Sequence, residues 1–266
     1  MITHKFNPNQ IFEIYALRLG DMEVDSPTVF YQTDFGKRIR KSYYFLCLKS
    51  KDHIVLVDTG ASQEELAIRG IFNRPSPKEL LQRININTDD VEAIILTHLH
   101  SDHFSEAESY PKCVFYVQRI EYQFWSEEIQ RFHSILYPPF TRGRPIAGID
   151  TLQKLNSLKR VRFLDGDGEV MPGIGYTWCG AHTPGSQLVT VQTNFGKILC
   201  CSDFIDNYRN WDERIPVGVL TNLVEWLKGI GKIEQMHLPR ESIIPGHDPQ
   251  LTTMFPQVAE DVIKVA

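Results

Sequence analysis

The sequence predicts an α/β protein built from layers of strands and helices. Short apolar runs rich in β-branched and aromatic residues recur along the whole chain, which is typical of strands covered on one or both faces. Helix signals lie between these runs, and no linker-like or low-complexity segment divides the chain. The 266 residues are enough for one large domain, and we expect a single domain over 1–266.

The expected strands follow from the apolar runs, and the first expected helix follows from its capping residues. Ser76 and Glu79 have the spacing of a capping box, and Pro77 suits the first helical position. The sequence therefore predicts a helix that starts after Ser76. The expected strands lie at 14–19, 43–48, 54–57, 93–96, 114–117, 188–191 and 198–201.

Two later segments carry further expectations. Apolar residues recur at helical spacing over 216–235, where Gly229 and Gly231 are expected stop signals. Aromatic residues are dense over 119–150. This stretch reads either as a helix and loop packed on the core or as a segment that covers a substrate, because aromatic side chains commonly wall apolar ligand pockets.

Composition and charge restrict the function classes. Lys plus Arg total 28 against 33 Asp plus Glu, a net charge of −5, which disfavours a general nucleic-acid binder. No apolar run is long enough for a membrane span, and the N-terminus lacks the pattern of a signal peptide. The five cysteines favour buried free thiols over disulfides. We therefore expect a cytoplasmic protein that acts on a small molecule, with its oligomeric state left open.

The most informative segment is a histidine cluster at the end of an apolar run. His98 and His100 are two positions apart, so their side chains project to the same side of an extended segment and can share one metal ion. Asp102 and His103 follow at a turn that can direct them toward a second ion. Imidazole and carboxylate ligands together suit zinc, and also iron, manganese or cobalt.

Three further segments add one candidate ligand each. His182 lies in a Gly/Pro-rich turn before an expected strand, Asp203 follows an apolar strand, and His247 follows another apolar run in the sequence Pro-Gly-His. Alone, each of these is ordinary turn chemistry. Their weight comes from their combination with the cluster at 98–103.

This combination resembles the metallo-β-lactamase superfamily of metal-dependent hydrolases, from Asp58 in the turn Val-Asp-Thr-Gly to His247. The resemblance implies an αββα sandwich with two metal ions at one edge. It implies that Asp203 bridges the two ions and that Asp58 orients a ligand imidazole as an outer hydrogen-bond acceptor. The ligands that it implies are His98, His100 and His182 for one ion and Asp102, His103 and His247 for the other.

Within the superfamily, the chain is most similar to the N-acyl homoserine lactonase-like branch. Only 19 residues follow His247, too few for the helical C-terminal domain of glyoxalase II. One position departs from the lactonase pattern, because those enzymes carry a substrate-contacting tyrosine three residues after the bridging aspartate and this chain has Asp206. Tyr208 is the nearest tyrosine and is a candidate replacement.

The resemblance implies hydrolysis of a lactone or related ester by a hydroxide that bridges two divalent ions, zinc being expected first. Asp102 is the expected proton relay to the leaving group. A thioester hydrolase of the glyoxalase II type and an iron-dependent oxidoreductase similar to persulfide dioxygenases remain as alternatives.

The substrate expectation rests on three residues. Trp125 and Tyr137 are expected to form an apolar wall near the metals. Asp206 is expected to repel an anionic substrate head and to accept a hydrogen bond from an amide or hydroxyl. A neutral, partly apolar lactone or ester is therefore the predicted substrate.

Overall fold

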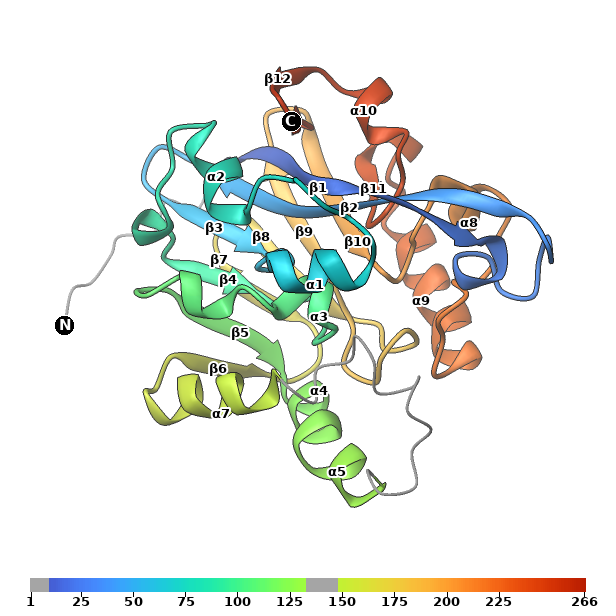
Figure 1. The fold of residues 1–266 in the computed structure, drawn as a ribbon, viewed down its shortest axis with the longest axis horizontal. Coiled ribbons are helices and arrows are strands. Elements are labelled where there is room, and N and C mark those ends of the chain that lie inside the picture. Colours follow the sequence, from blue (N-terminus) through green and yellow to red (C-terminus); the bar gives the residue numbers. More distant parts are fainter. Residues whose placement is uncertain (1–9, 133–147) are drawn as a thin grey trace.

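Two β-sheets packed face to face form the centre of the molecule (Figure 1). The computed structural model describes residues 10–132 and 148–266. Within these residues, the larger sheet has eight strands in the order β12-β13-β1-β2-β3-β4-β5-β6, and the smaller has five in the order β11-β10-β9-β8-β7. The strands β3 to β6 run parallel to one another, as do β10 and β11, and the other neighbours are antiparallel.

Seven of the thirteen strands in the described residues coincide with the expected strands, with some differences in length, and the other six were not among those expected. The first strand continues to residue 25, well past the expected end at 19. The strands of the larger sheet are β1 (Glu13–Asp25), β2 (Arg38–Lys49), β3 (Ile54–Val57), β4 (Ala93–Ile95), β5 (Val114–Gln118), β6 (Val161–Leu164), β12 (Gln257–Ala259) and β13 (Val262–Lys264). Those of the smaller sheet are β7 (Gly168–Met171), β8 (Ile174–Trp178), β9 (Gln187–Thr193), β10 (Gly196–Ser202) and β11 (Ile243–Pro245).

The helices are short, apart from two. The longer helices are α7 (Ile149–Ser157) and α9 (Leu223–Gln235). The short ones are α1 (Gln63–Ile68), α2 (Pro77–Gln82), α3 (Ser101–Phe104), α4 (Arg119–Gln123), α5 (Ile129–Phe132), α8 (Tyr208–Asp212) and α10 (Leu251–Met254), with a π-helical turn at Phe124–Glu128.

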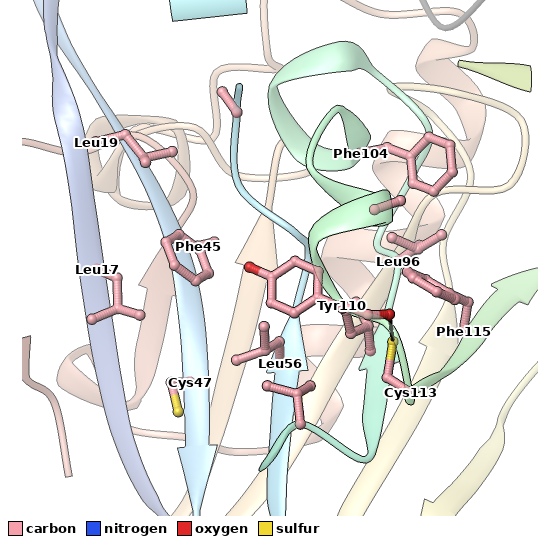
Figure 2. Close-up of a cluster of buried hydrophobic side chains, with 14 of the residues drawn as sticks. Leu17, Leu19, Phe45, Cys47, Leu56, Leu96, Phe104, Tyr110, Cys113 and Phe115 are labelled. Carbon is pink, nitrogen blue, oxygen red and sulfur yellow. Dashed lines mark hydrogen bonds between the residues drawn. The ribbon is translucent and has the colours of Figure 1, made fainter. Parts of the chain in front are cut away.

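Three hydrophobic clusters separate the layers and define the sandwich. One cluster lies between the larger sheet and the helices α1, α2 and α7. Figure 2 shows part of this cluster, with Leu17, Phe45 and Phe115 among its buried side chains. A second lies between the two sheets, and a third lies between the smaller sheet and α9. The predicted αββα arrangement is therefore confirmed. The extent of the domain over all 266 residues stays a prediction.

The alternation of side chains along strands places one strand in two clusters. In β1, Leu17 belongs to the cluster under the helices, whereas Ile14 and Ala16 belong to the cluster between the sheets. In β10, Cys200 faces the other sheet and Cys201 faces α9. This period of two explains why both faces of these strands are apolar in the sequence. All five cysteines are buried free thiols, as predicted.

The predicted helix after Ser76 is confirmed with its capping box. The Ser76 hydroxyl accepts from the Glu79 N–H at 3.3 Å, and the Glu79 carboxylate accepts from the Ser76 N–H at 2.8 Å. Over 119–150 the structure shows α4, the π-helical turn, α5 and the start of α7, so a helical segment packs on the core. Residues 133–147 lie outside the described residues.

The prediction for 216–235 was wrong at its start and in its stop signals. The helix begins at Leu223, because the preceding backbone is used in tertiary contacts: the Gly218 N–H donates to the Val29 carbonyl and the Thr221 N–H to the Ala181 carbonyl. It then continues through Gly229 and Gly231 to Gln235. Gly229 is required by packing, because a Cβ there would lie 2.3 Å from the Phe204 ring.

Candidate metal centre

The histidine cluster lies at the carboxyl end of a central strand of the larger sheet. β4 has β3 and β5 as parallel neighbours, and the chain leaves it at Leu96. His98 and His100 lie in the connection that follows, whereas Asp102 and His103 lie in α3. All four side chains are buried. A rigid, buried strand therefore fixes where this polar segment begins.

The smaller sheet supplies the other three candidate ligands. His182 lies between β8 and β9, Asp203 directly follows β10, and His247 closely follows β11. The pairing of β10 with β11 brings Asp203 and His247 together although they are far apart in sequence. The centre therefore lies where the ends of both sheets meet.

The structure brings all seven predicted ligands into two overlapping groups. In each group, one potential ligand atom per residue lies within 4.8 Å of the others, and Asp203 belongs to both groups. The Asp203 carboxylate lies 2.9 Å from His247 Nε2, 3.1 Å from His103 Nε2 and 3.4 Å from His182 Nε2. The first group is His98, His100, His182 and Asp203, and the second is Asp102, His103, Asp203 and His247.

The inner atoms of this cluster need a partner that the described protein atoms do not supply. Nε2 of His98, His103 and His247 and Oδ1 of Asp203 are buried without a hydrogen bond from the described residues. Two of these nitrogens lie within 3.1 Å of Asp203 Oδ1, but with the ring proton on Nδ1 both sides of these contacts are acceptors. Leaving buried polar atoms unsatisfied costs roughly 1–3 kcal/mol each. A divalent ion would satisfy several of them at once, and the imidazole and carboxylate set suits zinc, iron, manganese or cobalt. The residues present therefore fit a metal centre.

The protonation tendencies of two histidines suit metal binding. Burial lowers the pKa of His98 well below its ordinary value, and the charge of His103 adds to this effect. Burial likewise lowers the pKa of His182 to about 4. Both imidazoles are therefore neutral near pH 7, which is the form that binds a metal. The pKa of His103 is raised against the effect of burial, because the carboxylates of Asp203, Asp102 and Asp58 surround it.

The outer nitrogens of three histidines have fixed acceptors. Nδ1 of His103 donates to Asp58 Oδ2 at 2.7 Å, Nδ1 of His182 to the Val219 carbonyl at 2.7 Å, and Nδ1 of His247 to the Ser42 carbonyl at 2.8 Å. Each contact leaves Nε2 directed into the centre. Asp58 thus occupies the place that the sequence predicted for an outer acceptor, and it also accepts from the Thr97 N–H at 2.7 Å.

Asp102 has a neighbour that the sequence did not reveal. Arg69 Nη2 lies 3.1 Å from Asp102 Oδ1, and its guanidinium also pairs with Glu65. Burial raises the pKa of Asp102, but Arg69 and His103 outweigh burial and hold it below its ordinary value. A carboxylate held ionised is suited to binding a metal. The same surroundings work against the proton relay predicted for Asp102, which stays a prediction.

The sequence also missed Glu121, a fully buried carboxylate in α4. Its Oε1 accepts from the Leu99 N–H at 3.0 Å and from Trp125 Nε1 at 2.8 Å, and its Oε2 accepts from the Gly185 N–H at 2.8 Å. Leu99 lies between two candidate ligands, and Gly185 lies in the turn of His182. Glu121 therefore ties together the two loops that carry one ligand group. No local pattern marks it, because its partners come from three segments.

Trp125 lies beside the centre but is enclosed. Its ring centroid is 5.8 Å from that of His100, in an edge-to-face arrangement, and its side chain is 1% exposed. It therefore supports His100 from behind, and its predicted role as a substrate wall stays untested. Tyr137, the other residue of the predicted wall, lies outside the described residues.

Tyr208 has contacts of a different kind from those expected of a substrate ligand. Its N–H donates to Asp248 Oδ2 at 2.8 Å, and the Arg240 guanidinium lies 4.2 Å from its ring centroid. Its side chain is buried in the cluster between the sheets. Neither of these contacts involves a candidate metal ligand. Its hydroxyl is buried without a hydrogen bond from the described residues, and its predicted catalytic role stays a prediction.

Asp206 lies beside a candidate ligand, because its carbonyl accepts from the His247 N–H at 2.8 Å, and its side chain is paired. Lys41 Nζ is 3.4 Å from Asp206 Oδ2, and both side chains are largely buried. Burial raises the pKa of Asp206 to about 6, although Lys41 opposes this shift. The predicted repulsion of an anionic substrate assumed a free carboxylate. Because Lys41 pairs with Asp206, this carboxylate is not free, and the reason given for the repulsion no longer applies.

The fold and the centre define a metallo-β-lactamase-type hydrolase. Residues 38–247 match the metallo-beta-lactamase superfamily, so the chain belongs to this family. Within the described residues, no helix is long and apolar enough to cross a membrane.

Among characterised proteins, the chain is similar to N-acyl homoserine lactonases. One from Bacillus thuringiensis is 24% identical over 219 residues, which cover 77% of this chain and 80% of that protein. One from a Bacillus species is 23% identical over 252 residues, covering 89% and 93%.

Solved structures agree on the fold. An N-acyl homoserine lactone hydrolase with N-hexanoyl-L-homoserine bound at its catalytic metal centre has a TM-score of 0.72 at 19% identity, covering 94% of this chain and 98% of that one. AidC, described as a dizinc quorum-quenching lactonase, has a TM-score of 0.68 at 17% identity, covering 91% and 92%.

Proposed function

We propose that this protein hydrolyses a lactone or a related ester at a centre of two divalent metal ions. The observation that carries the proposal is the pair of four-residue groups that share Asp203. The similarity to N-acyl homoserine lactonases supports the choice of bond. Zinc is the first metal to test, because it commonly takes histidine nitrogen and carboxylate oxygen as ligands, and iron, manganese and cobalt follow.

The metals would supply an activated water and an electrophile. When bound, two divalent ions lower the pKa of a shared water so that it can act as hydroxide, and they polarise a carbonyl oxygen. In the overall reaction, the water oxygen bonds to the carbonyl carbon and the ring C–O bond breaks. The departing oxygen keeps the electron pair and takes up a proton, which leaves a hydroxy acid.

The chain's own residues would position these groups. Asp203 would hold the two ligand groups together, because its two oxygens face histidines of both. Asp58 would keep the His103 imidazole in the tautomer that directs Nε2 inward. Glu121 would fix the loops of His100 and His182 relative to each other. These roles require no serine or cysteine nucleophile.

The Asp203→Ala variant tests the proposal. We expect it to lose at least about a hundredfold in kcat/KM on a lactone while keeping the circular dichroism of the folded protein, since such losses accompany removal of a group that stabilises the transition state. The matched control is Asp212→Ala, which removes an exposed carboxylate from α8.

The same preparations should be tested on a panel containing a lactone, an ester, a thioester, a β-lactam and a phosphodiester. The proposal predicts that the lactone or ester leads. A leading thioester would favour a glyoxalase II type of activity, and a leading phosphodiester would contradict acyl hydrolysis. Wild-type turnover by Asp203→Ala would show that the shared ligand is assigned to the wrong residue.

A further inference from the structure

Lys41 lies beside the metal centre although its own sequence neighbourhood gives no indication of this. It belongs to β2, and its side chain is 12% exposed. Its Nζ lies 3.4 Å from Asp206 Oδ2 and 5.8 Å from the ring centroid of Tyr43. The Tyr43 ring in turn lies 5.0 Å from the ring of His247. Lys41 and Asp206 therefore flank the centre on the side of His247.

The charges around Lys41 keep it protonated. Burial alone would lower its pKa, but the carboxylates of Asp206 and Asp203 outweigh burial and raise the pKa above its ordinary value. The side chain of Asp206 is almost completely buried, so the ion pair is shielded from water. An ammonium group with a fixed position is thus present next to the candidate metal ligands.

A purely structural role explains this pair poorly. Burying two charges costs several kcal/mol per ion before their attraction is counted, and an apolar pair of similar volume is often as stable. The pair also has hydrogen-bonding groups that lack a partner among the described residues. Asp206 Oδ1 is buried without a hydrogen bond from the described residues, and Lys41 makes one side-chain hydrogen bond to them, at 3.4 Å. One acceptor and further N–H donors are therefore left side by side.

Arg69 is a useful contrast at the same centre. Its guanidinium forms ion pairs with Glu65 and Asp102. It also lies 5.6 Å from the ring centroid of Tyr43, the same ring that Lys41 approaches. The Arg69 guanidinium is thus paired with protein carboxylates, whereas the Lys41 ammonium has N–H donors that no described residue accepts. Of these two cations, Lys41 is the one suited to a substrate.

We infer that Lys41 and Asp206 form a polar subsite that binds the substrate next to the scissile bond. Lys41 Nζ donates to the acyl oxygen of the substrate, and Asp206 Oδ1 accepts from a hydroxyl or N–H on the adjacent carbon. This inference rests on the proposed hydrolytic function. It specifies the substrate class further, as a lactone or ester with a hydrogen-bond donor on the carbon next to the carbonyl.

The two halves of the subsite have different consequences. A donor to the acyl oxygen strengthens as negative charge develops there, so its loss lowers kcat by roughly 10²–10³-fold. A hydrogen bond to a charged acceptor contributes about 1.5–3 kcal/mol, so Asp206 should favour a donor-bearing substrate by roughly tenfold or more. Lys41 therefore acts on rate, and Asp206 acts on selectivity.

The test compares γ-butyrolactone with α-hydroxy-γ-butyrolactone on the metal-loaded protein. The variants are Lys41→Met, Lys41→Arg and the double variant Lys41→Met with Asp206→Leu, which replaces the ion pair by an apolar pair and so avoids an unpaired buried charge. The control is Lys49→Met, at the other end of the same strand. Metal content per chain is measured for every variant.

We expect Lys41→Met to lower kcat on both lactones by about a hundredfold and Lys41→Arg to recover part of that loss. The double variant should also lose the preference for the hydroxylated lactone. Calorimetry should show that it binds the hydroxylated product acid at least about tenfold more weakly than wild type. Lys49→Met should behave as wild type, and all variants should retain the same metal content.

The outcomes separate this inference from the proposed function. If the wild type hydrolyses the lactones and the double variant matches it in rate, preference and product binding, the subsite is refuted and the proposed function stands. If the wild type hydrolyses neither lactone, the proposed function fails. Calorimetry then still decides the subsite, because equal binding of the product acid by wild type and the double variant refutes it.

Discussion

Asp58 shows how a single residue prepares a metal ligand. Its backbone has a φ of +66°, a conformation that side-chain-bearing residues rarely adopt, and its carboxylate contacts both the Thr97 N–H and His103 Nδ1. Strain of this kind costs about 1–3 kcal/mol and persists where the surroundings fix it. The Asp58 backbone is therefore held in an unfavourable conformation that places its carboxylate against the His103 imidazole.

The Asp58→Asn variant tests this role. An amide can present an N–H to His103 Nδ1, which disturbs the tautomer, so we expect metal affinity to fall by about 10–100-fold. Competition with a chromophoric chelator measures the affinity. The control is Asp52→Asn, an exposed position in the turn before β3. Equal affinities of the two variants would mean that Asp58 does not orient a ligand.

At the level of single residues, sequence reasoning finds ligands but not their surroundings. His98, His100 and Asp102 are recognisable because the chemistry is concentrated in a few positions. Glu121 and Lys41 are not, because each acquires its role from partners far away in sequence, such as Gly185 and Asp206. A lone Glu in an amphipathic segment or a Lys in a strand carries no local signal of that kind.

At the level of elements, α9 illustrates what local signals miss. Its apolar spacing predicted a helix, but its beginning is set by distant contacts of 216–222. Its two glycines resemble stop signals in the sequence, yet the helix continues through both. The capping box at Ser76, by contrast, is satisfied within four residues, so the start of α2 was predictable.

The two glycines of α9 should respond oppositely to alanine. A Cβ at Gly229 would lie 2.3 Å from the buried Phe204 ring, whereas a Cβ at Gly231 would meet no atom within 4 Å. We expect Gly229→Ala to lower the free energy of unfolding by about 1–3 kcal/mol. Gly231→Ala should raise it by about 0.5–1 kcal/mol, because alanine favours the helix. Urea denaturation measures both, and shifts of the same sign would contradict this packing.

At the level of the whole molecule, the periodicity of the sequence indicates layers but not their connection. The strand order depends on partners such as β1 and β13, which lie at opposite ends of the chain. The family resemblance supplied the αββα arrangement. The three hydrophobic clusters then explain it, because each apolar face of the two sheets is covered.

The closed packing of these layers predicts unreactive cysteines. Burial raises the pKa of Cys47 and Cys200 to about 12 and that of Cys113 to about 11. At pH 8 the thiolate fraction of these groups is about one in a thousand or less, and the thiolate is the reactive form. A thiol reagent should therefore label fewer than one cysteine per native chain and all five after denaturation. Rapid labelling of several thiols in the native protein would contradict the packing.

The central claim is that hydrolysis depends on two metal ions held by the seven-residue centre. The most direct test is elemental analysis of the purified protein, followed by lactone hydrolysis before metal removal, after removal and after readdition of zinc. We predict about two equivalents of metal per chain, loss of turnover on removal and recovery on readdition. Full turnover in the metal-free protein would contradict the claim, as would a single bound iron together with oxygen consumption on a persulfide.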